Sequence, residues 1–143
     1  MILPDVNVLI LAHRDDQEDH EHVWSWLKRE VNSERPFAIA DVAVAGFIRI
    51  VTHPRIYSDP SSITDALGFV GGMMERSNCV PVSAGTRHWP IFQRVIVEAN
   101  ARGNLVPDAH LAAIAIEHGA TVATRDRGFS RFPGLSWLDP VGS

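Results

Sequence analysis

Short apolar runs alternate with longer amphipathic stretches along the chain. The first eleven residues are apolar apart from Asp5 and Asn7, a pattern typical of a strand that leads through a carboxylate into a helical turn. Further apolar runs have the length of strands, the last of them as an edge strand. These four runs cover residues 37–40, 80–83, 121–124 and 135–138.

The segments between these runs have the spacing of helices. Ser62 and Asp65 are placed like a capping box, which predicts a helix start. Pro107 and Gly119 are the residues expected at the start and the end of another helix. The predicted helices cover residues 23–31, 41–53, 62–76, 89–99 and 107–119.

Strands that alternate with helices favour an α/β fold whose sheet is parallel, with right-handed crossovers. A chain of 143 residues is long enough for one domain with a real core. Neither a repeat nor a linker interrupts it, so we predict a single domain over residues 1–143.

Composition excludes several classes of protein. No run of about 18 apolar residues exists, and the first residues do not form a secretion signal, so no membrane association is expected. The lone cysteine, Cys79, rules out an internal disulfide and favours a reduced, cytoplasmic protein. The net charge of −4 makes the chain as a whole a poor electrostatic match for nucleic acid.

Four aspartates occupy similar places relative to the predicted elements. Asp5, Asp41 and Asp126 each follow a predicted strand, and Asp108 begins a helix that leads into one. The carboxyl ends of parallel strands share one edge of a sheet, where ligands bind. The four carboxylates are therefore expected to converge on one cleft. Asp41 and Asp108 alone also suit helix starts and Asp126 a turn, whereas Asp5 at the end of an apolar strand is the hardest to explain without a partner.

Converging carboxylates repel one another and raise one another's pKa, and a hard divalent cation removes that cost. Oxygen ligands without a neighbouring cysteine or histidine pair favour Mg²⁺ or Mn²⁺, which activate water for attack on a phosphodiester. Polar neighbours of the aspartates are candidates to support such a site, or to serve only local structure. They are Asn7, Asn104 and Thr124.

Four blocks of the chain resemble the PIN-domain ribonucleases, specifically the VapC toxins of type II toxin–antitoxin systems. The blocks are PDVNVLI at 4–10, DVAVAGFIRIVTHPRIY at 41–57, GNLVPDAHLAAIAIEHG at 103–119 and TRDRGFSRFPGLSWLDP at 124–140. The second block, together with Arg87-His88-Trp89, is similar to the mycobacterial-type branch.

This resemblance implies a parallel sheet sandwiched by helices and an endoribonuclease site that depends on Mg²⁺ or Mn²⁺. Asp5, Asp108 and Asp126 match family metal ligands, and Asp41 matches the second acid of this branch. Gly128 stands where many relatives carry a further aspartate, which implies weak binding of a second ion.

The resemblance also implies partners. These are an RNA substrate such as a tRNA, a cognate antitoxin and a second copy of the toxin. The apolar stripe of the helix over 62–76 (Leu67, Val70, Met73, Met74) is a candidate antitoxin surface, but such a stripe is more often core. Arg125 and Arg127 flank Asp126, so at least one of them is expected to contact RNA.

Two other functions stay open. Phosphatases that form an aspartyl-phosphate also place an aspartate after the first strand. They require a partner lysine and a second aspartate two residues later, where this chain has Asn7. A non-catalytic binding module would use the aspartates only as helix caps. Substitution of Asp5 or Asp108 separates that module from a nuclease.

Overall fold

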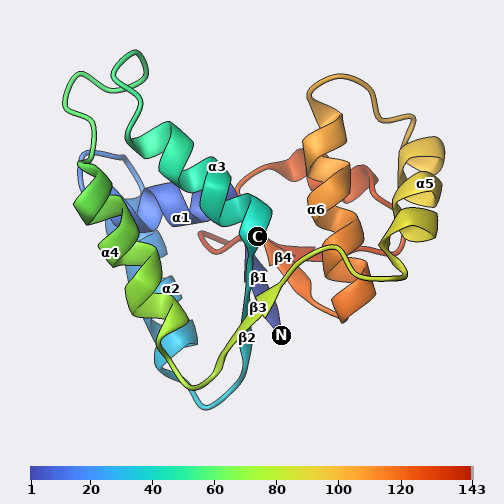
Figure 1. Cartoon of the computed structure of the whole chain (residues 1–143), viewed down its shortest axis with the longest axis horizontal. Helices are drawn as coiled ribbons and strands as arrows, with labels where there is room; N and C mark the ends of the chain where they lie inside the picture. Colours follow the sequence, from blue (N-terminus) through green and yellow to red (C-terminus); the bar gives the residue numbers. More distant parts are fainter. Residues whose placement is uncertain (143) are drawn as a thin grey trace.

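Five parallel strands form one sheet in the computed structural model, which describes residues 1–142. The strands lie in the order β3-β2-β1-β4-β5, so the first strand of the chain is the middle strand of the sheet (Figure 1). The strands are β1 (Ile2–Pro4), β2 (Phe37–Ala40), β3 (Cys79–Val82), β4 (Thr121–Ala123) and β5 (Ser136–Leu138).

Helices cover both faces of the sheet. Helices α1 to α4 lie on one side, and α5 and α6 pack against each other on the other side (Figure 1). The predicted α/β fold, with helices on both faces of a parallel sheet, is confirmed. The helices are α1 (Val6–His13), α2 (His20–Asn32), α3 (Asp41–Val51), α4 (Ile63–Met74), α5 (His88–Ala99), α6 (Leu105–His118) and the 3-10 helix η1 (Arg127–Arg131).

The register of β1 brings distant parts of the chain together. Ile2 pairs with Phe37 of β2 on one side and with Thr121 of β4 on the other. Immediately after β1, the backbone N–H of Asp5 donates a hydrogen bond of 2.9 Å to the carbonyl of Ala123. The residues that follow β1 and β4 therefore meet at the same edge of the sheet.

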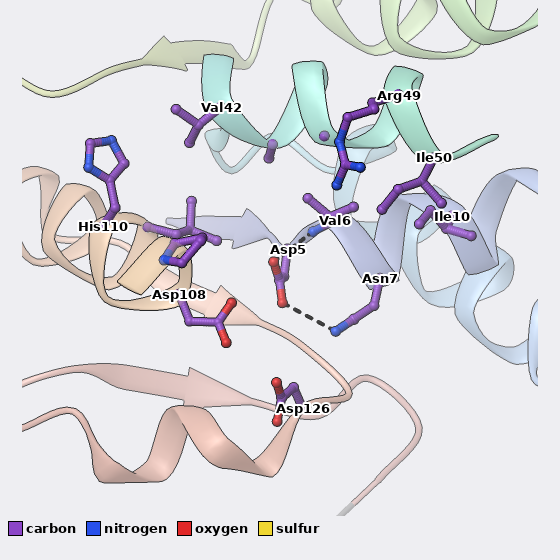
Figure 2. A pocket seen from close by; sticks show the side chains of 14 residues that line it. Asp5, Val6, Asn7, Ile10, Val42, Arg49, Ile50, Asp108, His110 and Asp126 are labelled. Carbon is purple, nitrogen blue, oxygen red and sulfur yellow. Dashed lines mark hydrogen bonds between the residues drawn. The ribbon is translucent and has the colours of Figure 1, made fainter. Parts of the chain in front are cut away.

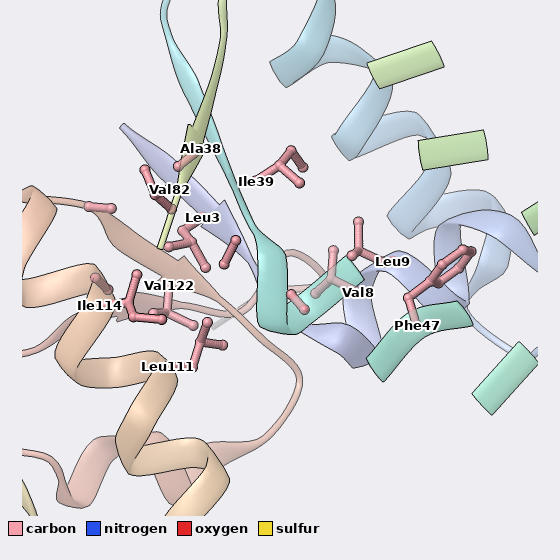
Figure 3. Packing of buried hydrophobic residues seen from close by; sticks show 14 of the residues in the cluster. Leu3, Val8, Leu9, Ala38, Ile39, Phe47, Val82, Leu111, Ile114 and Val122 are labelled. Carbon is pink, nitrogen blue, oxygen red and sulfur yellow. The ribbon is translucent and has the colours of Figure 1, made fainter. Parts of the chain in front are cut away.

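Buried side chains fill the space between the sheet and both helix layers (Figure 3). Leu3 and Val122 on the strands, Phe47 on α3 and Ile114 on α6 are completely buried. Helix α6 is deeply buried along its middle, where residues 111–115 are all buried. Burial of this kind contributes about 1.5–3 kcal/mol per large side chain and holds the strand ends rigidly.

Helix starts differ slightly from the prediction. Ser62 caps α4 as predicted, with its hydroxyl accepting the N–H of Asp65 at 3.0 Å. Helix α6 begins at Leu105, two residues before Pro107. A proline is tolerated in the first turn because the N–H it lacks would have no partner in the helix.

Within residues 1–142, no helix is long and apolar enough to cross a membrane.

Candidate functional site

Three carboxylates face one cavity of about 470 Å³ at the carboxyl edge of the sheet (Figure 2). Asp5 follows β1, Asp108 stands in the first turn of α6, and Asp126 follows β4. They come from segments that are far apart in the sequence, and the parallel sheet brings them together. The sequence predicted convergence of four aspartates, because the carboxyl ends of parallel strands share one edge of a sheet, and three of the four meet here.

Asp5 is the most strongly held of the three. Its carboxylate is 7% exposed. Oδ1 caps α1 by accepting the N–H of Val6 at 2.7 Å, and Oδ2 accepts from the Thr124 hydroxyl at 2.8 Å and from Asn7 Nδ2 at 3.2 Å. Such a network fixes the position of a buried carboxylate and offsets part of its desolvation.

Thr124 and Asn7 extend this network toward Asp126. The fully buried hydroxyl of Thr124 accepts the N–H of Asp126 and an N–H of Asn7, both at 3.0 Å. Asn7 Oδ1 in turn accepts the N–H of Arg125 at 3.1 Å. Two of the three residues named from the sequence as supports, Asn7 and Thr124, therefore lie at the site and orient its acids.

Asp126 caps the 3-10 helix η1. Its Oδ1 accepts the N–H of Gly128 at 2.8 Å, whereas its Oδ2 has no partner within residues 1–142. A Cβ atom at position 128 would lie 2.9 Å from Oδ1 of Asp126. A side chain at position 128 would therefore require the Asp126 carboxylate to shift from its present position.

Negative charge in the cavity is poorly compensated. Burial, followed by the charges of Asp5 and Asp126, raises the pKa of Asp108 to about 6. Burial also raises the pKa of Asp5, and the hydrogen bonds from Thr124 and Val6 offset only part of that effect. Two of the three carboxyl groups thus have a raised pKa. A bound cation would stabilise their charged forms, so the site favours cation binding.

The donor set suits a hard cation that retains water ligands. Within residues 1–142, no three histidine, cysteine or acidic side chains lie close enough to hold one ion directly. Mg²⁺ usually keeps several of its waters and takes only one or two carboxylates. Asp5, Asp108 and Asp126 therefore fit an ion that they contact partly through water.

The comparisons with known proteins decide the family. The profile of the PIN domain matches residues 2–135. The chain belongs to the PIN domain family. Among its relatives are ribonuclease VapC43 of Mycobacterium tuberculosis, 40% identical over 141 residues (99% of this chain, 96% of the relative), and ribonuclease VapC25 of the same species, 39% identical over 140 residues (98% and 99%).

Solved structures have the same fold at low identity. VapBC2 from Rickettsia felis, bound to a DNA fragment from its promoter, has a TM-score of 0.72 at 17% identity, covering 97% of this PIN domain and 98% of that chain. VapC20 of M. tuberculosis, a toxin that cleaves the sarcin-ricin loop, has a TM-score of 0.69 at 10% identity, covering 94% and 98%. Identities this low show the fold alone.

Two residues predicted for the site lie elsewhere in this PIN domain. Asp41 is exposed at the first position of α3, accepts the N–H of its neighbour Val42 at 2.8 Å, and does not line the cavity. Asn104 is exposed at the N-cap of α6 and makes no side-chain capping bond. Their roles in the site stay predictions that this arrangement does not support.

The two arginines predicted to contact RNA also lie outside the cavity lining. Arg125 binds both oxygens of Asp139 at 2.9 and 3.0 Å, and Asp19 at 3.1 Å, so it joins the C-terminal segment to the start of α2. Arg127 is exposed. The PIN domain instead places Arg49 of α3 and His110 of α6 at the cavity.

His110 was not singled out from the sequence. It stands two residues after Asp108 on a helix whose remaining residues are mostly apolar, so no spacing or composition signal marked it. Its ring lines the cavity and its Nδ1 lies 3.2 Å from Nε2 of His88. That contact depends on the packing of α5 against α6, which the sequence alone did not predict.

Proposed function

We propose that this PIN domain is an endoribonuclease and acts as the toxin of a toxin–antitoxin pair. One observation carries the chemistry: three carboxylates from separate elements share a cavity, where burial and mutual repulsion raise the pKa of Asp108. VapC ribonucleases that are about 40% identical over nearly the whole chain support RNA as the substrate. Cleavage of cellular RNA would inhibit growth and implies a cytoplasmic site of action.

The metal we propose is Mg²⁺ or Mn²⁺, contacted by Asp5, Asp108 and Asp126. A bound ion of this kind supplies a Lewis acid that activates water and neutralises charge on the phosphate. Thr124 and Asn7 hold Asp5 in one orientation, and Gly128 does the same for Asp126 through its backbone N–H. Asp108, half buried and unpaired, is the acid whose charge depends most on a cation.

An antitoxin is the proposed protein partner, together with a second copy of the toxin. The VapBC structures that share this fold are toxin–antitoxin complexes. Helix α4 offers a partly exposed apolar stripe for such a contact, since Leu67 and Met74 are exposed whereas Val70 and Met73 are buried. The buried half of this stripe is core, in line with the more conservative interpretation of the sequence.

The phosphatase alternative receives no support from the site. Asn7 occupies the position of the second aspartate and is used to hold Asp5. Lys28, the only lysine, lies 5.8 Å from the ring of Trp24 on α2 and does not line the cavity.

The decisive experiment measures Mn²⁺ binding by calorimetry and RNA cleavage on the wild type, on Asp108→Asn and on the control Glu75→Gln. Glu75 is an exposed acid at the end of α4 and lies outside the cavity lining. We expect Asp108→Asn to lose both activities while its circular dichroism spectrum is unchanged, and Glu75→Gln to keep them. Equal activity in all three proteins would refute the nuclease site and leave a binding module.

A further inference from the structure

The wall of the cavity opposite the acids is apolar. Helix α3 contributes Val42, Ala43, Gly46 and Ile50, and Leu111 of α6 adds to this surface. A site for a hydrated cation alone needs oxygen ligands and gains nothing from such a wall. The apolar surface therefore points to a second occupant beside the ion.

The size of the cavity also indicates a second occupant beside the ion. One water molecule takes about 30 Å³, so an ion with six waters fills roughly 180 Å³. The cavity holds about 470 Å³, which lies in the range of sites for small organic ligands. The remaining space suits a planar ring with a sugar attached.

Arg49 stands at one end of the apolar wall. Figure 2 shows its guanidinium directed into the cavity, on the side of Val6 and Asp5. The side chain is exposed and forms no hydrogen bond or ion pair with any residue from 1 to 142. It is also the one arginine or lysine that lines this cavity. A free guanidinium beside a carboxylate centre suits a phosphate group of a substrate.

His110 lies near Val42, at the other end of the wall (Figure 2). Its Nδ1 contacts Nε2 of His88, a 7% exposed ring that stacks on Phe92 with centroids 5.4 Å apart. Nδ1 of His88 is buried and has no partner within residues 1–142. Because buried N–H groups without an acceptor are rare, the proton of His88 belongs on Nε2, which donates to His110. His110 is thus left with Nε2 as a hydrogen-bond donor.

We propose that the wall between Val42 and Arg49 is a subsite for one unstacked nucleotide of a single-stranded RNA. The base packs on the apolar face of α3, an acceptor atom on its edge meets Nε2 of His110, and a neighbouring phosphate binds Arg49. Seven residues of helix separate the two ends, about 10 Å, which spans a base and its phosphate. A base inside a duplex could not enter, because its faces are stacked. This inference rests on the proposed function and names the residues that hold one nucleotide of its substrate.

The test uses AMP, UMP and ribose 5-phosphate as probes, titrated with Mg²⁺ present and followed by NMR. We expect each nucleotide to bind at least about fivefold more tightly than ribose 5-phosphate, since only the nucleotides carry a base. His110→Ala and Val42→Ser should remove this preference, whereas the control Val97→Ser, on an exposed position of α5, keeps it. Arg49→Gln should weaken all three probes alike, and the control Arg29→Gln, exposed on α2, should not.

Equal affinity for all three probes, or a base preference that survives both His110→Ala and Val42→Ser, would overturn the subsite. The proposed function is tested separately, by measuring RNA cleavage by Asp108→Asn. If that variant is inactive while the probes show no base preference, the subsite is wrong and the nuclease stands. If it cleaves RNA normally while the base preference is present, the subsite stands and the acidic centre is wrong.

Discussion

The hydroxyl of Thr124 donates a hydrogen bond of 2.8 Å to Oδ2 of Asp5, although 119 positions separate the two residues. The bond joins the end of β4 to the end of β1, which lie side by side in the sheet. Thr124 is fully buried and Asp5 is 7% exposed, so little water competes for this bond. The orientation of Asp5 therefore depends on Thr124, the residue that directly follows β4.

Replacing Thr124 with valine tests this dependence. Thr124→Val keeps the shape of the side chain but leaves Oδ2 of Asp5 and the N–H of Asp126 without this partner. We expect a loss of about 1–3 kcal/mol in the free energy of unfolding, measured by urea denaturation, and a fall in RNA cleavage. Thr124→Ser retains the hydroxyl and should restore most of both. Equal losses in the two variants would show that packing, not the hydroxyl, matters.

The raised pKa of Asp108 predicts a pH-dependent stability in the absence of divalent ions. The pKa is about 6 in the folded protein against the ordinary value of 3.8, so the folded protein binds this proton more tightly than the unfolded chain does. The stabilising contribution of protonation is complete below about pH 4 and is lost as the pH rises through about 6.

Asp108→Asn should therefore be more stable than the wild type at neutral pH. Because the side chain is about half exposed and solvent screens its charge, we expect roughly 1 kcal/mol near pH 7, shrinking toward zero near pH 4. Unfolding in EDTA at several pH values measures this difference. A difference that stays constant with pH would contradict the assignment. Addition of Mn²⁺ should stabilise only the wild type.

Asp41 and Asp126 provide a direct comparison of two predicted acids. Asp126 lines the cavity and Asp41 does not. Calorimetry with Mn²⁺ should give an affinity for Asp41→Ala within about twofold of the wild type, because an exposed charge outside the site is screened. Asp126→Ala should lower the affinity by about tenfold or more. Loss of binding in Asp41→Ala would restore the fourth carboxylate predicted from the sequence.

Arg125 is expected to act on stability more than on substrate binding. Arg125→Gln removes the ion pairs with Asp139 and Asp19, of which Asp139 is 9% exposed. We predict a loss of about 1 kcal/mol in unfolding free energy, with the KM for RNA little changed. Arg127→Gln, at the exposed neighbour, should leave stability unchanged. A large rise in KM for Arg125→Gln alone would support the RNA contact instead.

Much of the fold could be predicted because the residues that end helices and the apolar runs that form strands are clear in the sequence. Ser62 and Gly119 mark helix ends that the structure confirms, and the five apolar runs all join the sheet. The third strand begins one residue earlier than predicted, at Cys79. The sequence could not show the strand order, because it depends on which crossovers pack best over the whole core.

The site was predictable only where the backbone decides it. Asp5 and Asp126 follow neighbouring strands, so the sheet alone brings them together. On α3 the rotation of the helix decides instead: the side facing the cavity carries Val42, Ala43, Gly46, Arg49 and Ile50, which leaves position 41 outside. For Arg125, the competing acids at positions 19 and 139 are too distant in sequence to be anticipated.

The central position of β1 has a consequence for biosynthesis. Asp5 leaves the ribosome more than a hundred residues before β4, one of the two strands that pair with β1, and before Asp126. Pairings between such distant segments form late and slowly in folding. A growing chain that has not reached Asp126 therefore lacks one of the three carboxylates of the cavity, so we expect RNA cleavage at this centre only after β4 and Asp126 have been made.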